Sequence, residues 1–282
     1  MTDYKGTIAK TLTKIEQAVG LKRRKVTVLT YHSISADDTI VDVDPSEFRK
    51  QIEWLINEGF EFLSLNEVVS YLKGNKKINK PSVCLTFDDG YADILDEVVS
   101  LLRDSNIPAS VFVLSDRDHV DRDELENDKK LLTYRDIKKL INLGWEIGSH
   151  SATHDNFSSI NTHLVNEIVN SKKVMEKKLG IKVLYFSYPK GIINSKVAKL
   201  VKQANYHAGF GVGEAKLGLN TDLVYIPRIG IDRSHTLLQF QSLFSNWYVV
   251  YSRFKKFIVI HGSRILRHVK PEDMITERSY SG

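Results

Sequence analysis

Residues 82–90 read SVCLTFDDG and contain the clearest strand of the chain. Six uncharged residues, including branched and aromatic side chains, run directly into two aspartates and a glycine. An apolar run of this length, ended by turn residues, is typical of a strand buried on both faces of a parallel sheet. Similar patterns recur on both sides of it. We expect strands at 26–34, 60–65, 82–87, 109–114, 145–149, 182–188, 206–212 and 223–231, and helices at 8–19, 45–59, 66–72, 92–103, 133–142, 162–179, 194–205 and 236–244.

The order of these elements predicts the fold class. Strands and helices alternate with short connections, which implies parallel strands joined by right-handed crossovers. More than six such units in one domain favour a (β/α) barrel, incomplete or distorted, over a doubly wound open sheet. We divide the chain into an N-terminal amphipathic helix with a basic linker (1–25), the barrel (26–245) and a basic, aromatic C-terminal tail (246–282).

The net charge of +5 is concentrated in two places. Residues 22–25 are all basic, and residues 251–270 contain basic but no acidic side chains. A nucleic-acid-binding protein would spread basic and aromatic side chains over one face, so no nucleic-acid partner is expected. The single cysteine, Cys84, lies in an apolar run, where we expect a buried and inert thiol.

The two ends of the chain predict where the protein is found. Residues 1–25 lack the apolar core of a secretory signal, and no stretch is long and apolar enough to span a bilayer. The expected location is therefore cytoplasmic. Aromatic and basic side chains interleave in residues 246–270. This composition fits either a terminal helix packed on the barrel or peripheral contact with an anionic membrane.

Asp88 and Asp89 follow the strand at 82–87 directly. In parallel α/β folds, chemistry gathers at the carboxyl ends of the strands. With Gly90 relaxing the backbone, both carboxylates can turn into one pocket, where like charges repel unless a cation holds them or one is protonated. The pair therefore indicates a metal site. A helix N-cap is the structural alternative.

A second polar cluster follows the strand at 145–149. His150 and His154 are four residues apart, a spacing that can place both imidazoles on one metal ion. With Asp89 they form a set of two imidazoles and one carboxylate that leaves positions open for water and substrate. This set suits one divalent metal, Zn²⁺ first and Co²⁺ or Fe²⁺ as alternatives. Asp88 then remains free to act as a base.

These motifs resemble those of the polysaccharide deacetylases, carbohydrate esterase family 4, which include the chitooligosaccharide deacetylases. LTFDDG (85–90) and HSATH (150–154) look like the paired motifs of the family. The stretches TYHSI (30–34), FSYPKG (186–191) and IPRI (226–229) are similar to the poly-N-acetylglucosamine deacetylases of biofilm exopolysaccharide. The resemblance implies a distorted (β/α)7 barrel and metal-dependent hydrolysis of N-acetyl groups from an N-acetylhexosamine-containing polysaccharide or glycoconjugate.

The resemblance also implies roles for single residues. Asp88 would be the base that takes a proton from the attacking water. The implied metal ligands are Asp89, His150 and His154, and the implied substrate and oxyanion contacts are Tyr188, Pro189 and the backbone N–H of Lys190. The chain departs from the family at Ser187, where an arginine that pairs with the base is usual. Arg228 is our candidate substitute, with a structural salt bridge as its alternative.

Two histidines are candidates for the general acid. The family often has a histidine after a late apolar strand, and FIVIHG (257–262) places His261 in such a position. His32, at the end of the first strand, is the alternative. The histidines for which we expect no role in the site are His119, His163, His207, His235 and His268.

Two other functions fit the same residues. One is a catalytically silent barrel that binds a glycan, which the departure at Ser187 favours. The other is a deformylase or deacetylase of a lipid-linked amino sugar, which the basic tail favours. Because all four metal and base residues are intact, we expect an enzyme whose partner is an N-acetylated glycan. The sequence sets no oligomeric state.

Overall fold

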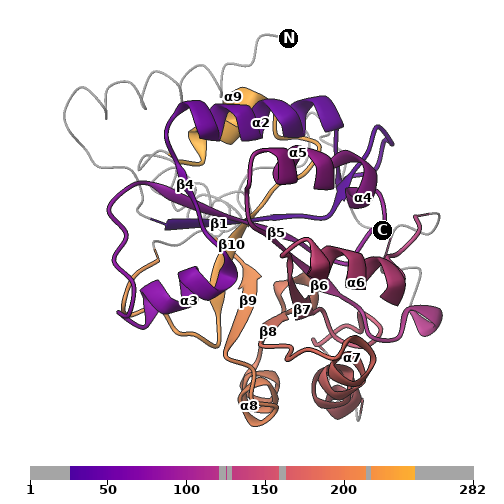
Figure 1. Cartoon of the computed structure of the whole chain (residues 1–282). Helices are drawn as coiled ribbons and strands as arrows, with labels where there is room; N and C mark the ends of the chain where they lie inside the picture. The colour runs from indigo at the N-terminus through magenta and orange to yellow at the C-terminus, as the bar shows by residue number, and fades with distance from the viewer. Residues whose placement is uncertain (1–25, 121–124, 126–128, 159–162, 214–216, 245–282) are drawn as a thin grey trace, which may run out of the picture.

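The computed structural model describes residues 26–120, 125, 129–158, 163–213 and 217–244, with strands inside and helices around them (Figure 1). The strands are β1 (Val26–Tyr31), β2 (Ser33–Ile34), β3 (Asp42–Val43), β4 (Glu61–Phe62), β5 (Ser82–Phe87), β6 (Ala109–Val113), β7 (Glu146–Ser149), β8 (Tyr185–Ser187), β9 (Ala208–Val212) and β10 (Ile226–Gly230). The α-helices are α2 (Pro45–Asn57), α3 (Leu65–Leu72), α4 (Ile94–Glu97), α5 (Val99–Asp104), α6 (Tyr134–Asn142), α7 (Ser171–Leu179), α8 (Ser195–Gln203) and α9 (Leu237–Ser242). Three short turns complete the description: the 3-10 turns η1 (Arg117–His119) and η3 (Pro189–Gly191), and the π turn η2 (Asn166–Asn170).

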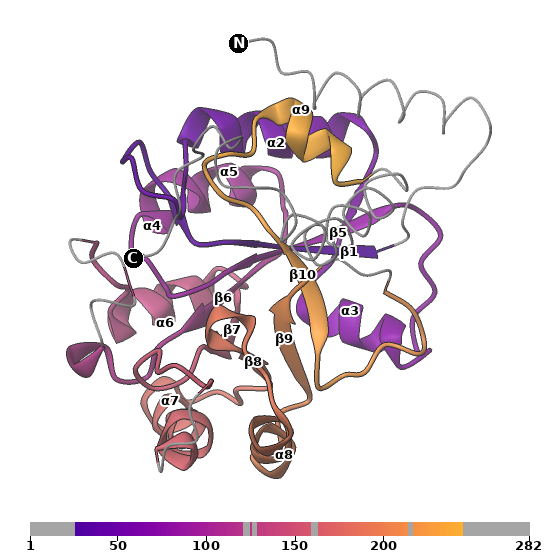
Figure 2. The ribbon, with the colours of Figure 1, turned by 180° about the vertical axis from the view of Figure 1, so that it is seen from behind.

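Seven parallel strands close into a barrel. Hydrogen-bonded neighbours follow in the order β1, β10, β9, β8, β7, β6 and β5, and β1 also pairs with β5, which completes the ring. The short strand β4 pairs with the first two residues of β5. Seen from behind, the helices again lie outside the strands (Figure 2). The predicted (β/α)7 barrel is confirmed, and the alternative of an open sheet is wrong.

Strands β1 and β5 contain no charged residue and are buried along their whole length. Successive residues of β1 and β5 belong alternately to two apolar clusters. Val28 and Cys84 lie in one cluster with α3, whereas Leu29 and Leu85 lie in the other with residues of the outer helices. This burial explains the unbroken apolar runs in the sequence.

Cys84 is a buried free thiol, and burial raises its pKa well above the ordinary value, in agreement with an inert residue.

Helix starts agree with the capping residues in the sequence. Asp44 accepts hydrogen bonds from the first turn of α2, and Pro45 occupies the first helical position, where no backbone N–H is needed. Thr133 and Asp136 form a reciprocal capping box at the start of α6. These caps fix where each helix leaves the rim of the barrel.

Two local structures differ from the sequence prediction. The expected helix at 92–103 is interrupted at Val98 and divides into α4 and α5. The stretch at 37–44, which lies outside every strand and helix expected from the sequence, contains β3, which pairs with β2. Asp42 stabilises this small sheet by accepting hydrogen bonds from Ser33 and Thr39. Such pairing depends on side-chain contacts that local propensity does not report.

Predictions for the two chain ends fall outside the described residues. They are the helix at 8–19 with its basic linker and the tail at 246–282, including its contact with a membrane. Within the described ranges, no helix combines the length and hydropathy needed to cross a bilayer.

Candidate metal and catalytic site

The polar residues singled out in the sequence gather at the carboxyl end of the barrel. Asp88 and Asp89 follow β5 directly, and His150 follows β7. His154 lies four residues farther on, in the loop after β7. Parallel strands present their carboxyl ends at one rim, so side chains far apart in the sequence become neighbours there. Arg228 reaches the same place from β10.

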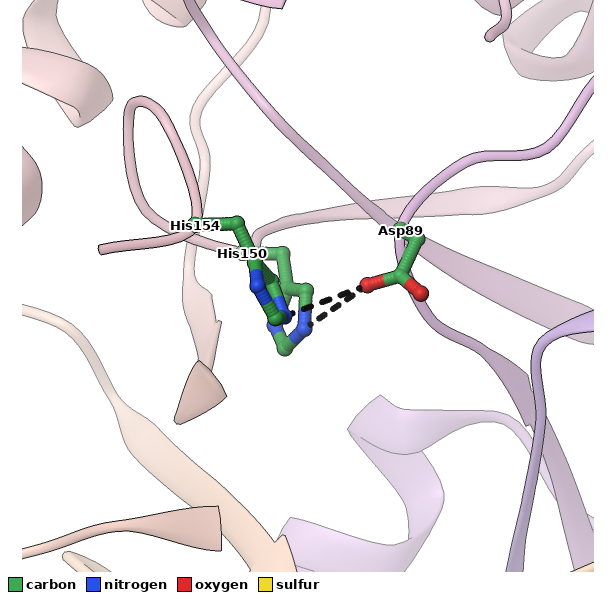
Figure 3. A group of neighbouring side chains, drawn as sticks. All are labelled: Asp89, His150 and His154. Atoms are coloured by element: carbon green, nitrogen blue, oxygen red, sulfur yellow. Dashed lines mark ion pairs between the residues drawn. The ribbon is translucent and has the colours of Figure 1, made fainter. Parts of the chain in front are cut away.

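Asp89, His150 and His154 form a compact buried cluster (Figure 3). Oδ1 of Asp89 lies 3.2 Å from Nε2 of His150 and 3.5 Å from Nε2 of His154. One candidate ligand atom from each residue lies within 4.8 Å of the others, and the described part of the chain holds no second group of this kind. Two imidazoles and one carboxylate at this separation can surround a single divalent cation.

The hydrogen bonding of these residues shows that they suit a cation. Nδ1 of His150 lies 3.0 Å from the carbonyl oxygen of Ser187, which can only accept, so Nδ1 carries the proton. In the neutral ring, the lone pair of Nε2 then faces the acceptor Oδ1 of Asp89. That oxygen and Nδ1 of His154 are buried without a hydrogen-bond partner among the described residues. Buried acceptors that face each other are unfavourable unless a positive charge lies between them.

The backbone at this cluster adopts conformations that non-glycine residues rarely occupy. The φ angle is +65° at Asp89, +76° at Ser151 and +68° at His154. Each such angle costs roughly 1–2 kcal/mol, and strain of this kind concentrates at functional sites. Gly90 also has a positive φ, and a Cβ there would lie 2.9 Å from Cγ1 of Val113. The glycine of the DDG motif is therefore required by both conformation and space.

Asp88 lies beside the cluster in a bidentate pair with Arg228. Nη1 of Arg228 donates to Oδ1 at 2.8 Å, Nη2 donates to Oδ2 at 2.6 Å, and Ser187 Oγ also donates to Oδ2 at 3.0 Å. Burial alone would raise the pKa of Asp88, but the charges of Arg228 and His150 outweigh it and hold that pKa well below its usual range. Asp88 is therefore ionised at neutral pH, with Oδ2 4.0 Å from Nε2 of His150.

Arg228 is fully buried, and its donors have partners around the site. Its contacts beyond Asp88 are Thr86 Oγ1 at 3.0 Å, Ser187 Oγ at 2.6 Å, the Gly211 carbonyl oxygen at 3.3 Å and the ring of Phe112. A buried guanidinium needs such complete pairing to offset the loss of water. This geometry agrees with the hypothesis that Arg228 replaces the arginine missing at Ser187. A catalytic part for Arg228 stays a prediction.

Comparison with known proteins assigns a family to this arrangement. Residues 75–209 match the family model described as Polysaccharide deacetylase. The chain contains a polysaccharide deacetylase domain. The match includes Asp88, the cluster of Asp89, His150 and His154, and the segment around Ser187.

Relatives of the deacetylase domain share both sequence and fold with it. The poly-β-1,6-N-acetyl-D-glucosamine N-deacetylase of Staphylococcus aureus (strain MRSA252) is 27% identical over 227 residues, 77% of this chain and 76% of the relative. The Streptococcus pyogenes deacetylase PplD, solved in complex with acetate, has a TM-score of 0.67 at 23% identity, covering 78% of this chain and 97% of that one. IcaB from Ammonifex degensii has a TM-score of 0.67 at 20% identity, with the same shares. The family resemblance seen in the sequence is confirmed.

The pKa values of the two histidines of the deacetylase domain are shifted in opposite directions. Burial lowers the pKa of His154 to about 4, so this imidazole is neutral and available as a ligand. Burial also acts to lower the pKa of His150, but Asp88 and Asp89 outweigh it and raise that pKa. Because metal ligands are neutral imidazoles, a cation would compete with a proton at His150.

A cavity of about 500 Å³ lies along the same rim. His32, Arg228 and His235 line it, together with Ile40 and Val212, whose side chains are 61% and 45% exposed. The sequence predicted no role for His235, although it follows β10 closely. The rule that strand ends gather at one rim would have identified it. The cavity offers space for a substrate beside the buried cluster.

The other site residues predicted from the sequence are His32, His261 and Tyr188, and they lie in different surroundings or outside the described residues. The charge of His32 lowers the pKa of both Asp88 and Asp89, which places this histidine within electrostatic reach of the two carboxylates. His261 lies outside the described residues. Tyr188 is buried, and its hydroxyl donates to the carbonyl oxygen of Val224 at 2.6 Å, so that hydroxyl has a structural partner.

The segment after β8 occupies the same rim in a constrained form. Pro189 is buried at the start of η3, and Lys190 has a φ of +55°. The φ at Gly191 is also positive, and a Cβ there would lie 3.0 Å from the backbone nitrogen of Val212. This close approach fixes the segment against β9. Contact of Tyr188, Pro189 or Lys190 with a substrate stays a prediction.

Proposed function

We propose that the chain is a zinc-dependent hydrolase that removes N-acetyl groups from a polymer of N-acetylglucosamine. One observation carries the proposal: a buried set of two imidazoles and one carboxylate lies beside an ionised aspartate that an arginine holds in place. The name of the staphylococcal relative supports the substrate class. Zn²⁺ is the metal proposed because it is commonly bound by two histidines and a carboxylate, with a further position left for water.

Asp88 is the proposed base. Asp89, His150 and His154 would hold a divalent cation, which would lower the pKa of the attacking water and polarise the acetyl carbonyl. Asp88 takes the proton from that water. A carboxylate offers about four acceptor positions, and Arg228 and Ser187 occupy three of them. One position remains for the water, and the bidentate pair keeps it aligned.

His32 is the proposed acid that gives a proton to the leaving amine. It follows β1 directly, lines the cavity with Arg228, and lies within electrostatic reach of Asp88 and Asp89. An amine is a poor leaving group unless it is protonated, so amide hydrolysis needs such a donor. The role that the sequence left open between two histidines is therefore proposed for His32.

The variant His32→Gln is expected to lower kcat for amide substrates by about 100-fold or more and to leave zinc affinity unchanged. Hydrolysis of 4-nitrophenyl acetate serves as the control, because its leaving group departs without a proton. That reaction should stay within about threefold of the native rate, since only the acid step is removed. An equal loss with both substrates would remove His32 from this role.

The cavity supports a sugar as the substrate. Ile40 and Val212 present exposed apolar side chains that can cover the face of a pyranose ring, while Asp232 and His235 on the same lining offer hydrogen-bonding groups for its hydroxyls. Mixed apolar and polar lining of this kind is usual for ligand sites. The acetamido group of such a sugar would point toward Asp88.

The proposal is tested by measuring acetate release from oligomers of β-1,6-linked N-acetylglucosamine, from chitin oligomers and from peptidoglycan fragments, with zinc supplied. We expect release from the β-1,6-linked oligomers at a rate at least about tenfold above the other two, equivalent to about 1.4 kcal/mol of discrimination. If the folded, zinc-loaded chain releases no acetate from any of them, the proposed function is wrong.

A further inference from the structure

Glu167 is a buried carboxylate that braces the loop between the two histidines. It lies on the π turn η2, and only 2% of its surface is exposed. Its Oε2 accepts hydrogen bonds from the backbone N–H groups of Ala152 at 3.1 Å and Thr153 at 3.0 Å, and its Oε1 accepts from Thr153 Oγ1 at 3.0 Å. All three bonds go to residues that lie between His150 and His154.

The three hydrogen bonds of the Glu167 carboxylate all go to this loop. No lysine or arginine in the described ranges forms an ion pair with Glu167. The three hydrogen bonds therefore offset the cost of burying its carboxylate away from water. A buried carboxylate is stable only when its acceptor positions are used in this way. Hydrogen bonds to a charged group are stronger than those between neutral groups. The loop and Glu167 therefore stabilise each other.

The loop needs such support because its conformation is strained. Ser151 and His154 both have φ angles in the left-handed region. The carbonyl side of the loop is held by the segment that follows β6, since the N–H of Asp116 donates to the carbonyl oxygen of Ala152 at 2.9 Å. Glu167 holds the opposite, N–H side. With both sides fixed, the imidazole of His154 is brought to 3.5 Å from Asp89.

The π turn brings Glu167 to this position. In η2 the backbone N–H of Ser171 donates to the carbonyl oxygen of Asn166, five residues earlier. This wider turn precedes α7, and both Glu167 and its neighbour Ile168 are buried. Single π turns within helices are uncommon and often occur near functional sites.

We propose that Glu167 is a positioning residue that sets the affinity of the cation site by holding the 151–154 turn. This inference rests on the proposed function, because it takes Asp89, His150 and His154 as the ligands. Glu167 touches neither the ligands' donor atoms nor the reacting groups. Removing it lets the strained turn relax and moves His154 away from the other two ligands. Mutation of residues that orient metal ligands from outside the coordination sphere typically weakens metal binding by about 10–100-fold.

The experiment measures the zinc dissociation constant of metal-stripped full-length protein by competition with a chromophoric chelator, together with its thermal midpoint. Glu167→Ala is expected to raise the dissociation constant by about 10–100-fold. Glu167→Gln keeps one oxygen for the two N–H donors and should bind zinc within about fivefold of the native chain. The matched control is Glu176→Ala on α7, which removes a comparable bond, from Glu176 Oε1 to the Val183 N–H at 3.0 Å, away from the site. It should lower the thermal midpoint and leave zinc affinity unchanged.

The outcomes separate this inference from the proposed function. If the native chain itself does not bind zinc, the proposed function fails. If the native chain binds zinc and Glu167→Ala binds equally well, the inference alone fails. It also fails if Glu167→Gln is as weak as Glu167→Ala, because hydrogen bonding would then not be the cause. If Glu167→Ala does not fold, Glu167→Asp replaces it. That side chain is one methylene too short to hold both N–H groups, and native affinity in this variant would overturn the inference.

Discussion

Replacing Asp88 by Asn is expected to lower the rate of acetate release by about 10³-fold or more while zinc affinity stays within about threefold of native. Asn has the same shape as Asp and can still accept hydrogen bonds from Arg228, but it cannot take a proton from water. The three proposed ligands are untouched by the change. The measurement is kcat for acetate release, with the zinc dissociation constant determined on the same preparation.

The stability of this variant must be followed at the same time. Asp88→Asn leaves the buried guanidinium of Arg228 without a counter-charge, and breaking a buried ion pair costs up to about 3–5 kcal/mol. Ser187→Ala is the matched control, because it removes one hydrogen bond to Asp88 and keeps the carboxylate. It should lower the rate by less than about tenfold. Native activity in a folded Asp88→Asn variant would exclude Asp88 as the base.

His154→Ala should lose zinc binding by at least about 100-fold and lose acetate release at micromolar zinc. A site of two imidazoles and one carboxylate depends on each of its few ligands, and removing one leaves two groups that cannot complete the coordination. The protein should stay folded, because Nδ1 of His154 has no hydrogen-bond partner among the described residues and its loss breaks little. Zinc affinity and the thermal midpoint of the metal-free form are the measurements.

His119→Ala is the control for this substitution. The side chain of His119 is 78% exposed and pairs only with Asp116 in the described structure, away from the ligand cluster. Its removal should change neither zinc affinity nor rate. If His154→Ala bound zinc as tightly as His119→Ala, the cluster would not be the metal site.

The barrel and the four central residues could be predicted because their signals are local. The strand at 82–87 is an unbroken apolar run that ends at Asp88 and Asp89, and the strand at 145–149 ends at His150. Parallel strands place these ends at one rim whatever the detailed packing. The closing of the ring by β1 and β5, and hence the exact neighbours at that rim, could not be read from any single stretch.

The supporting residues could be predicted less well because their partners are distant in sequence. Arg228 was a candidate partner for Asp88 by position, but its contacts with Thr86 and Ser187 depend on the register of β10, β5 and β8. Ser187 counted as a departure from the family pattern. In the structure its small side chain hydrogen-bonds both Asp88 and the guanidinium.

The sequence gives no indication of a role for Glu167. The position of its side chain depends on a π turn, which hydrophobic periodicity does not reveal. The expected helix at 162–179 treats Glu167 as one of several charged residues. The π turn η2 and the burial of two successive residues, Glu167 and Ile168, appear only in three dimensions. The sequence does not predict the interruption at Val98 between α4 and α5 for a similar reason, since tertiary packing overrides helix propensity.

Acetate release by metal-stripped protein, titrated with zinc on a β-1,6-linked N-acetylglucosamine oligomer, tests most directly whether Asp89, His150 and His154 hold one catalytic cation. We expect no release from the stripped chain, and a rate that rises linearly and levels off at one zinc per chain. If the stripped chain works at the full rate, or if added zinc leaves the activity unchanged, these three residues do not hold a catalytic cation.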